Sequence, residues 1–241
     1  MSLQDLLLAS IVIMAGSGIQ GAVGFGGALF AAPFLMLIDP HLVPGPVNIA
    51  GIVLSALMMQ RDSGGHHWDA VRWPMIGLLP GSIAGAAVLR ALSESVESLT
   101  MLFANTVLAA VVLSIIGFHP RRKPGQLFIG GTASGFMGTA AGIGGPPIAL
   151  FFQTATGPEI RGALARFFAI SSAISLALLW LFGQLGHQEL VAGLWLVPAT
   201  VAGFVASRWL ATRIDRGHVR VAVLTLSGLS SLVAIGRAVL T

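Results

Sequence analysis

Long apolar stretches dominate the chain, and polar residues fall between them rather than alternating with them. Apolar segments of about twenty residues are typical of helices that cross a bilayer, whereas a membrane barrel shows short alternating strands. The pattern therefore predicts an all-α, polytopic membrane protein. The expected helical segments are residues 46–59, 73–89, 99–118, 167–182, 191–207 and 221–235, with longer apolar blocks at 6–38 and 128–152.

Helix breakers interrupt both long blocks. Residues 142–147 read Gly-Ile-Gly-Gly-Pro-Pro, and residues 24–27 read Gly-Phe-Gly-Gly. Glycine and proline weaken or end a helix, and lipid cannot satisfy the backbone groups that a break releases. The broken segments must therefore face protein or a polar cavity. Paired interruptions at matching places in two halves of a membrane protein indicate a transport site.

One fixed offset of 118 residues relates the two halves of the chain. The matching pairs are Gly26 and Gly144, Gly27 and Gly145, Pro80 and Pro198, Gly85 and Gly203, and Arg90 and Arg208. A single offset over some sixty residues predicts an internal duplication. We expect a first repeat at residues 1–118, a cytoplasmic linker at 119–125 and a second repeat at 126–241, forming one membrane domain.

The basic residues indicate how the repeats are oriented, because cytoplasmic loops collect Lys and Arg. If both interrupted blocks are hairpins that return to their own side, nearly all basic residues lie inside, and only Arg90 and Arg237 lie outside. The inside set is Arg61, Arg72, Arg121, Arg122, Lys123, Arg161, Arg208, Arg213, Arg216 and Arg220. This count favours two inverted repeats, each a re-entrant helical hairpin plus three transmembrane helices. Eight full spans in a parallel repeat remain the alternative.

Composition supports a membrane protein and removes several other classes. The chain of 241 residues is 55% hydrophobic and only 9% charged, whereas soluble domains carry roughly 25% charged residues. There are no cysteines, which excludes disulfides and thiolate metal sites. We attribute the net charge of +4 to membrane orientation rather than to nucleic-acid binding. Residues 1–15 lack a basic leader, so we expect no cleaved signal peptide.

The glycine-rich tips are the first candidate site. Successive backbone N–H groups and the N-terminal end of a half-helix form a concavity that suits an anion. The alternative is close helix packing, which also favours glycine in membranes. The candidate substrate-binding residues in the two tips are Gly24, Gly26, Gly27, Gly142, Gly144, Gly145 and Pro146.

Two polar residues that share the 118-residue offset extend this candidate site. We expect Arg166 about one turn into its span, where a cation is costly unless it faces a cavity or a partner. An anionic substrate would neutralise it; the alternative is snorkelling to the interface. Asn48 occupies the matching position as a neutral donor, or else as a helix cap or an interhelical hydrogen bond. Gln20 and Gln153 flank the tips and add further candidate donors.

The expected spans contain no catalytic set. They lack a Ser/His/Asp arrangement, paired carboxylates and a His/Glu metal signature. His66 and His67 are adjacent in a loop that we expect to be solvated. We therefore predict no catalytic residues, no metal, no cofactor and no enzymatic activity.

The duplicated arrangement resembles the sulfite exporter TauE/SafE family over essentially the whole chain. The resemblance rests on Gly-Phe-Gly-Gly at 24–27 and Gly-Ile-Gly-Gly-Pro-Pro at 142–147, although the first motif departs from the fuller Gly-Gly-Gly-x-x-x-Pro form. It implies a multi-pass protein of the cell inner (cytoplasmic) membrane that moves sulfite, sulfonates or related oxyanions. We predict a secondary transporter for a small sulfur-containing oxyanion that works by alternating access. An anion channel and a membrane-embedded assembly partner are the alternatives.

Overall fold

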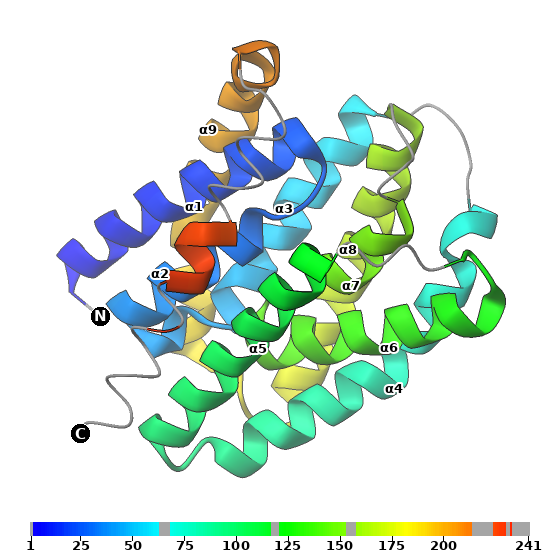
Figure 1. Cartoon of the computed structure of the whole chain (residues 1–241). Coiled ribbons are helices and arrows are strands. Elements are labelled where there is room, and N and C mark those ends of the chain that lie inside the picture. Colours follow the sequence, from blue (N-terminus) through cyan, green and yellow to red (C-terminus); the bar gives the residue numbers. More distant parts are fainter. Residues whose placement is uncertain are drawn as a thin grey trace.

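A computed structural model describes residues 2–62, 68–116, 121–152, 158–213, 224–229 and 232, and every regular element within them is helical. This confirms the predicted all-α class (Figure 1). The α-helices are α1 (Leu3–Val23), α2 (Gly27–Ile38), α3 (Gly45–Arg61), α4 (Trp68–Leu92), α5 (Val96–Ile116), α6 (Pro124–Ala141), α7 (Gly145–Ala149), α8 (Pro158–Leu181) and α9 (His187–Arg213). Two short 3-10 helices are η1 (Pro40–Leu42) and η2 (Leu150–Phe152).

Six helical segments among the described residues are long and apolar enough to cross a membrane, so the chain is a multi-pass membrane protein. They are Leu3–Val23, Pro40–Arg61, Val71–Leu92, Val96–Ile115, Arg161–Leu181 and His187–Leu210. At 1.5 Å per residue, the 21 residues of α1 extend about 32 Å, close to the thickness of the hydrocarbon core. The first arm of the first hairpin is therefore longer than a re-entrant arm needs to be.

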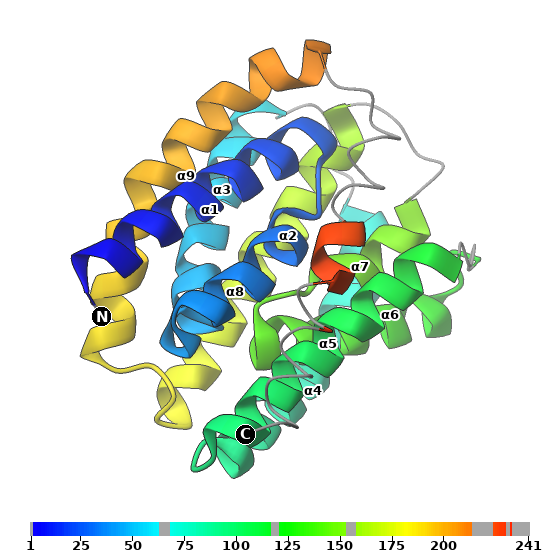
Figure 2. The same cartoon turned by 60° about the vertical axis from the view of Figure 1, so that its left-hand side comes forward.

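Both long apolar blocks break where glycine predicts a break, and each folds back on itself. A Cβ added to Gly16 of α1 would lie 3.3 Å from Ala31 Cβ of α2, and one added to Gly138 of α6 would lie 3.4 Å from the Cα of Gly144. Figure 2 shows α2 returning alongside α1. The blocks are therefore helical hairpins, each with a glycine-rich tip.

Two close helix pairs, α4 with α6 and α1 with α9, form the sides of the bundle. Their helices approach through glycine: a Cβ on Gly81 would collide with the carbonyl oxygen of Thr132, and one on Gly203 with that of Met14. Gly81, Gly85, Gly131 and Gly135 all allow this close packing, since a Cβ on each would collide with backbone of the paired helix. Helices α3 and α8 lie between the two pairs (Figure 2).

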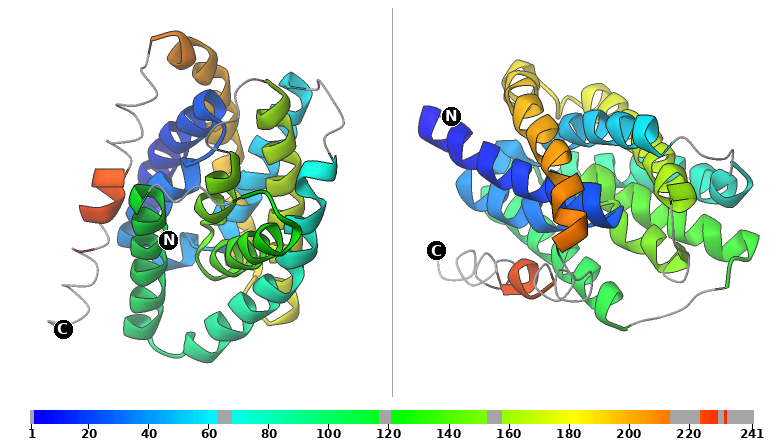
Figure 3. Two further views of the ribbon diagram at one scale, coloured as in Figure 1. Left: turned by 45° about the vertical axis from the view of Figure 1, so that its right-hand side comes forward. Right: turned by 90° about the horizontal axis from the view of Figure 1, so that it is seen from above.

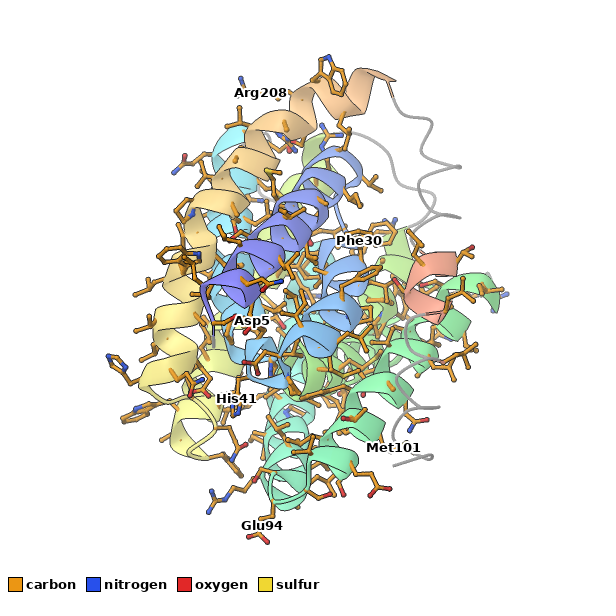
Figure 4. The ribbon with its side chains drawn as sticks, turned by 90° about the vertical axis from the view of Figure 1, so that its left-hand side faces the viewer. Asp5, Phe30, His41, Glu94, Met101 and Arg208 are labelled. Carbon is orange, nitrogen blue, oxygen red and sulfur yellow. The ribbon has the colours of Figure 1, made fainter. Side chains whose placement is uncertain are left out.

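The remaining described elements complete the bundle around the hairpins. Residues 224–229 lie beside α5 (Figure 3), and the Ser227 hydroxyl donates to the Leu29 carbonyl oxygen at 2.8 Å. The last predicted span, residues 221–235, lies only partly within the described residues. His41 and Glu94 lie at one end of the molecule and Arg208 at the opposite end (Figure 4).

Candidate functional site

The tips of the two hairpins meet inside the bundle. A Cβ built on Gly145 would lie 4.0 Å from the backbone nitrogen of Gly26. Around this contact is a cavity of about 50 Å³. Its lining comes from the tips and from α1, α3, α6 and α8: Gln20, Gly26, Ala28, Leu29, Val47, Asn48, Gly51, Ser55, Gly138, Gly142, Gly144, Gly145, Pro146, Phe168, Ser171 and Ser172.

The structure brings most of the predicted site residues to this one cavity. Those that line it are Gly26, Asn48, Gly142, Gly144, Gly145 and Pro146. Gly24, Gly27 and Arg166 are not among its lining residues. The two motifs are 118 residues apart in the chain, yet both line the same cavity.

Backbone geometry explains glycine at two of these positions. Gly26, the residue before α2, has φ of 94°, and Gly142, the residue after α6, has φ of 72°. Side chains other than glycine rarely adopt this left-handed region. A Cβ on Gly26 would meet no atom within 4 Å, so the backbone conformation rather than space requires glycine there.

The first tip presents backbone donors to the cavity. The first hydrogen bond of α2 runs from the Phe30 N–H to the Gly26 carbonyl oxygen at 3.0 Å, so the N–H groups of Gly27, Ala28 and Leu29 precede the helical ladder. Ala28 and Leu29 line the cavity. The positive end of the helix dipole points the same way. This end of α2 can therefore accept an anion.

Asn48 connects the first half of the chain to the second tip. Its side-chain nitrogen donates to the carbonyl oxygens of Pro44 at 3.0 Å and Gly138 at 3.1 Å. Both amide hydrogens are thus occupied, and the residue is buried. In this arrangement Asn48 positions α6 against α3, the interhelical role that the sequence left open beside that of a donor to the substrate.

Three serines supply hydroxyl groups that the sequence reasoning missed. Ser55 follows Asn48 and Gly51 at helical spacing on the cavity face of α3, and Ser171 and Ser172 lie on α8. All three are buried. The Ser55 hydroxyl has no hydrogen-bond partner among the described residues. Only its spacing from Asn48 could have signalled Ser55 in the sequence.

Gly24 and Gly27 have neighbours outside this cavity. Gly27 packs so closely on α1 that a Cβ would collide with the Gly16 carbonyl oxygen, and it lines an adjoining cavity of about 30 Å³. Gly24 has φ of 106° and ends α1, and a Cβ there would lie 3.2 Å from Arg161 Cγ. These two glycines shape the tip and its packing.

Arg166 lies about one turn into its candidate membrane span, as predicted. That span begins at Arg161, within α8, which itself begins at Pro158. Phe168 of the cavity wall comes two residues later, about 200° around the helix. The half-buried Arg166 side chain therefore leaves α8 on the face opposite the cavity.

A charge cluster with a buried carboxylate lies beside the first tip. Asp62, only 5% exposed, accepts from Arg161 at 3.0 and 3.3 Å and from Arg61 at 3.1 and 3.2 Å. Arg61 also donates to the carbonyl oxygen of Gly21 at 2.7 Å and to the Ser207 hydroxyl at 3.1 Å. Two guanidinium groups and one carboxylate leave one positive charge at this tip. The cluster joins residues 99 positions apart, which no local pattern reveals.

The other candidate sites among the described residues offer fewer polar groups that could bind a ligand. A larger hollow of about 1070 Å³ lies between α4, α5 and α6, but its walls include the exposed apolar side chains of Phe128 and Ile129. In a bilayer such a surface faces acyl chains. No group of three or more metal-ligating side chains occurs within the described part of the chain. His66, His67 and Gln153 lie outside the described residues.

An all-helical, multi-pass membrane protein with two broken hairpins around one buried cavity falls in the class of membrane transport proteins. More specifically, the chain belongs to the sulfite exporter TauE/SafE family, whose family model matches residues 8–234. This confirms the predicted family. Proteins of this family are exporters and not enzymes.

A curated relative supports the same assignment. It is described as "Probable sulfite/organosulfonate exporter TauE", comes from Cupriavidus necator, and is 27% identical over 215 residues. The alignment covers 86% of this chain and 84% of the relative. The search of solved structures found no match.

Proposed function

We propose that this protein is a secondary transporter that moves a small sulfur-containing oxyanion across the cytoplasmic membrane by alternating access. The anion is held between the two hairpin tips. The observation that carries the proposal is the cavity shared by Gly26 of the first tip and Gly142, Gly144 and Gly145 of the second. A site shared by both halves is what alternating access around a fixed point requires.

The charges and dipoles near the cavity favour an anion over a cation. The N-terminal end of α2 directs backbone N–H groups into it, and the nearby Arg61–Asp62–Arg161 cluster carries a net positive charge. Among the described residues, those that line the cavity include no Asp or Glu. A negative guest would therefore gain hydrogen bonds and a favourable potential without facing a fixed negative charge.

The proposal includes inverted repeats, and helix packing supports the duplication. The 118-residue offset carries α4 onto α9 and α6 onto α1, so it exchanges the two closest helix pairs of the bundle. The predicted orientation puts His41 and Glu94 outside and Arg208 inside, in agreement with their opposite ends in Figure 4. Reporter fusions or cysteine labelling at the two ends of α3 and α8 would test the inversion.

The test of transport uses purified protein in two assays. In a thermal-shift panel against sulfite, sulfate, thiosulfate, sulfoacetate, taurine and simple carboxylates, a substrate at a hundred times its Kd stabilises by about 2.7 kcal/mol. In proteoliposomes, that same anion should move at a saturable rate and, with the correct coupling ion, against its gradient. Flux that does not saturate and never accumulates would instead indicate a channel.

A further inference from the structure

We infer that Ser55 is a direct ligand of the transported anion and that, with the end of α2, it limits the substrate to a compact oxyanion. The inference rests on the proposed function and adds a residue and a size limit to it. Ser55 of α3 is fully buried and lines the cavity, and its hydroxyl has no hydrogen-bond partner among the described residues.

An unpartnered buried hydroxyl is unusual, because removing a polar group from water without a new hydrogen bond is unfavourable. Opposite it, the cavity is lined by Ala28 and Leu29, whose backbone N–H groups precede the hydrogen-bond ladder of α2. Unused donors thus face the same small space from two elements. An oxyanion placed there accepts from both the hydroxyl and the helix end.

The size of the cavity limits what can be held. A volume of about 50 Å³ has room for about four water-sized guests. This volume suits a sulfur atom with its oxygens, whereas a carbon chain attached to the same group would have to extend beyond the cavity. The walls opposite the tips are Phe168, Ser171 and Ser172 of α8, and the Ser172 hydroxyl already lies 3.0 Å from where a Cβ on Gly51 would be. Little space remains for a chain between α3 and α8.

Ser134 of α6 provides a matched control. It is also fully buried, and its hydroxyl also has no hydrogen-bond partner among the described residues. It does not line this cavity. Replacing either serine with alanine removes an unsatisfied polar group, so both variants should fold and melt at or slightly above the wild-type temperature. Only Ser55→Ala should change the response to anions.

The experiment measures sulfite-induced thermal stabilisation of the wild type, Ser55→Ala, Ser55→Cys and Ser134→Ala. We expect the apparent Kd for sulfite to rise about 10- to 100-fold in Ser55→Ala and by less in Ser55→Cys, which keeps the shape but donates weakly. Ser134→Ala should match the wild type. Sulfoacetate and taurine should stabilise the wild type far less than sulfite.

The possible outcomes distinguish a failure of this inference from a failure of the proposed transport function. A wild type that responds to sulfite while Ser55→Ala responds equally overturns the role of Ser55 alone. Equal stabilisation by sulfite and by the chain-bearing sulfonates overturns the size limit alone. A wild type that responds to no anion overturns the proposed function and the inference together.

Discussion

The two hairpin tips occupy matching places in the duplicated chain, but they differ in what they offer an anion. The first opens into α2, a helix of 12 residues, whereas the second opens into α7, a helix of 5 residues that continues as a 3-10 helix. The offset of 118 residues places Ala28 and Leu29 of the first tip at the positions of Pro146 and Pro147 of the second. Proline has no N–H, so the second tip lacks two donors that the first possesses.

The two tips therefore differ in the number of backbone hydrogen-bond donors that they offer. The motif at 142–147 is the more conspicuous in the sequence, yet its two prolines supply no N–H group, so it offers fewer backbone donors. The less conspicuous motif at 24–27 precedes α2, and the N-terminal end of α2 carries the backbone donors. The charge cluster of Arg61, Asp62 and Arg161 also contacts the first tip. In the second hairpin Arg122 donates to the Phe151 carbonyl oxygen at 2.9 Å, at the end of the hairpin away from its tip.

The largest effect should come from removing the carboxylate that holds the first tip. Asp62→Ala leaves two guanidinium groups facing each other in a partly buried place, and we expect a loss of about 3–5 kcal/mol in stability. The measurement is thermal unfolding in one detergent, without ligand. The control is Glu189→Gln, which breaks the pair with the exposed His41 and should have an effect of about 1 kcal/mol or less. Equal losses in both variants would contradict the structural role of the cluster.

The next largest effect should come from placing a proline in the first tip at the position where the second tip has one. Ala28→Pro removes one N–H at a position in the first helical turn, where proline is tolerated, and copies the residue found at Pro146. Loss of a hydrogen bond to a charged group corresponds to about 1.5–3 kcal/mol, so the apparent Kd for sulfite should rise about 10- to 100-fold. Sulfite titration of the folded variant by thermal shift measures it. Unchanged affinity would show that α2 does not bind the anion.

Arg166→Ala should have a smaller effect on binding than Ala28→Pro. The side chain leaves α8 on the face away from the cavity, so we expect the apparent Kd for sulfite to change by less than about threefold, below the energy of one hydrogen bond to a charged group. The same titration checks this, with flux in proteoliposomes as a second reading. A loss of sulfite affinity as large as that of Ala28→Pro would show that Arg166 contacts the anion in another conformation of the protein.

The smallest effect should come from the reverse exchange at the second tip. Pro146→Ala adds an N–H to a helix of only five residues, which has little dipole to align it with a guest. We expect sulfite affinity to stay within about threefold of wild type, the scale of half a kcal/mol. If Pro146→Ala increased sulfite affinity tenfold or more, the second tip could bind the anion as well as the first once it had the same donor.

The sequence predicted what depends on local chemistry and missed what depends on packing. Glycine and proline marked both breaks, and the shared offset indicated that the two tips belong together; the fold then brings Gly26 and Gly145 into proximity. Ser55 could not be recognised, because one serine among many acquires a role only when a cavity forms beside it. The direction of the Arg166 side chain could not be predicted, because the packing of the helices decides which face of α8 lines the cavity.

The glycine contacts that join α4 to α6 and α1 to α9 constrain how such a protein could change shape. Each pair takes one helix from either half of the chain, and carbonyl oxygens fit where side chains would otherwise stand. The halves are thus interlaced, and neither can swing away from the other as a block. In the alternating access that we propose, the units expected to move are therefore the two mixed pairs, relative to α3 and α8.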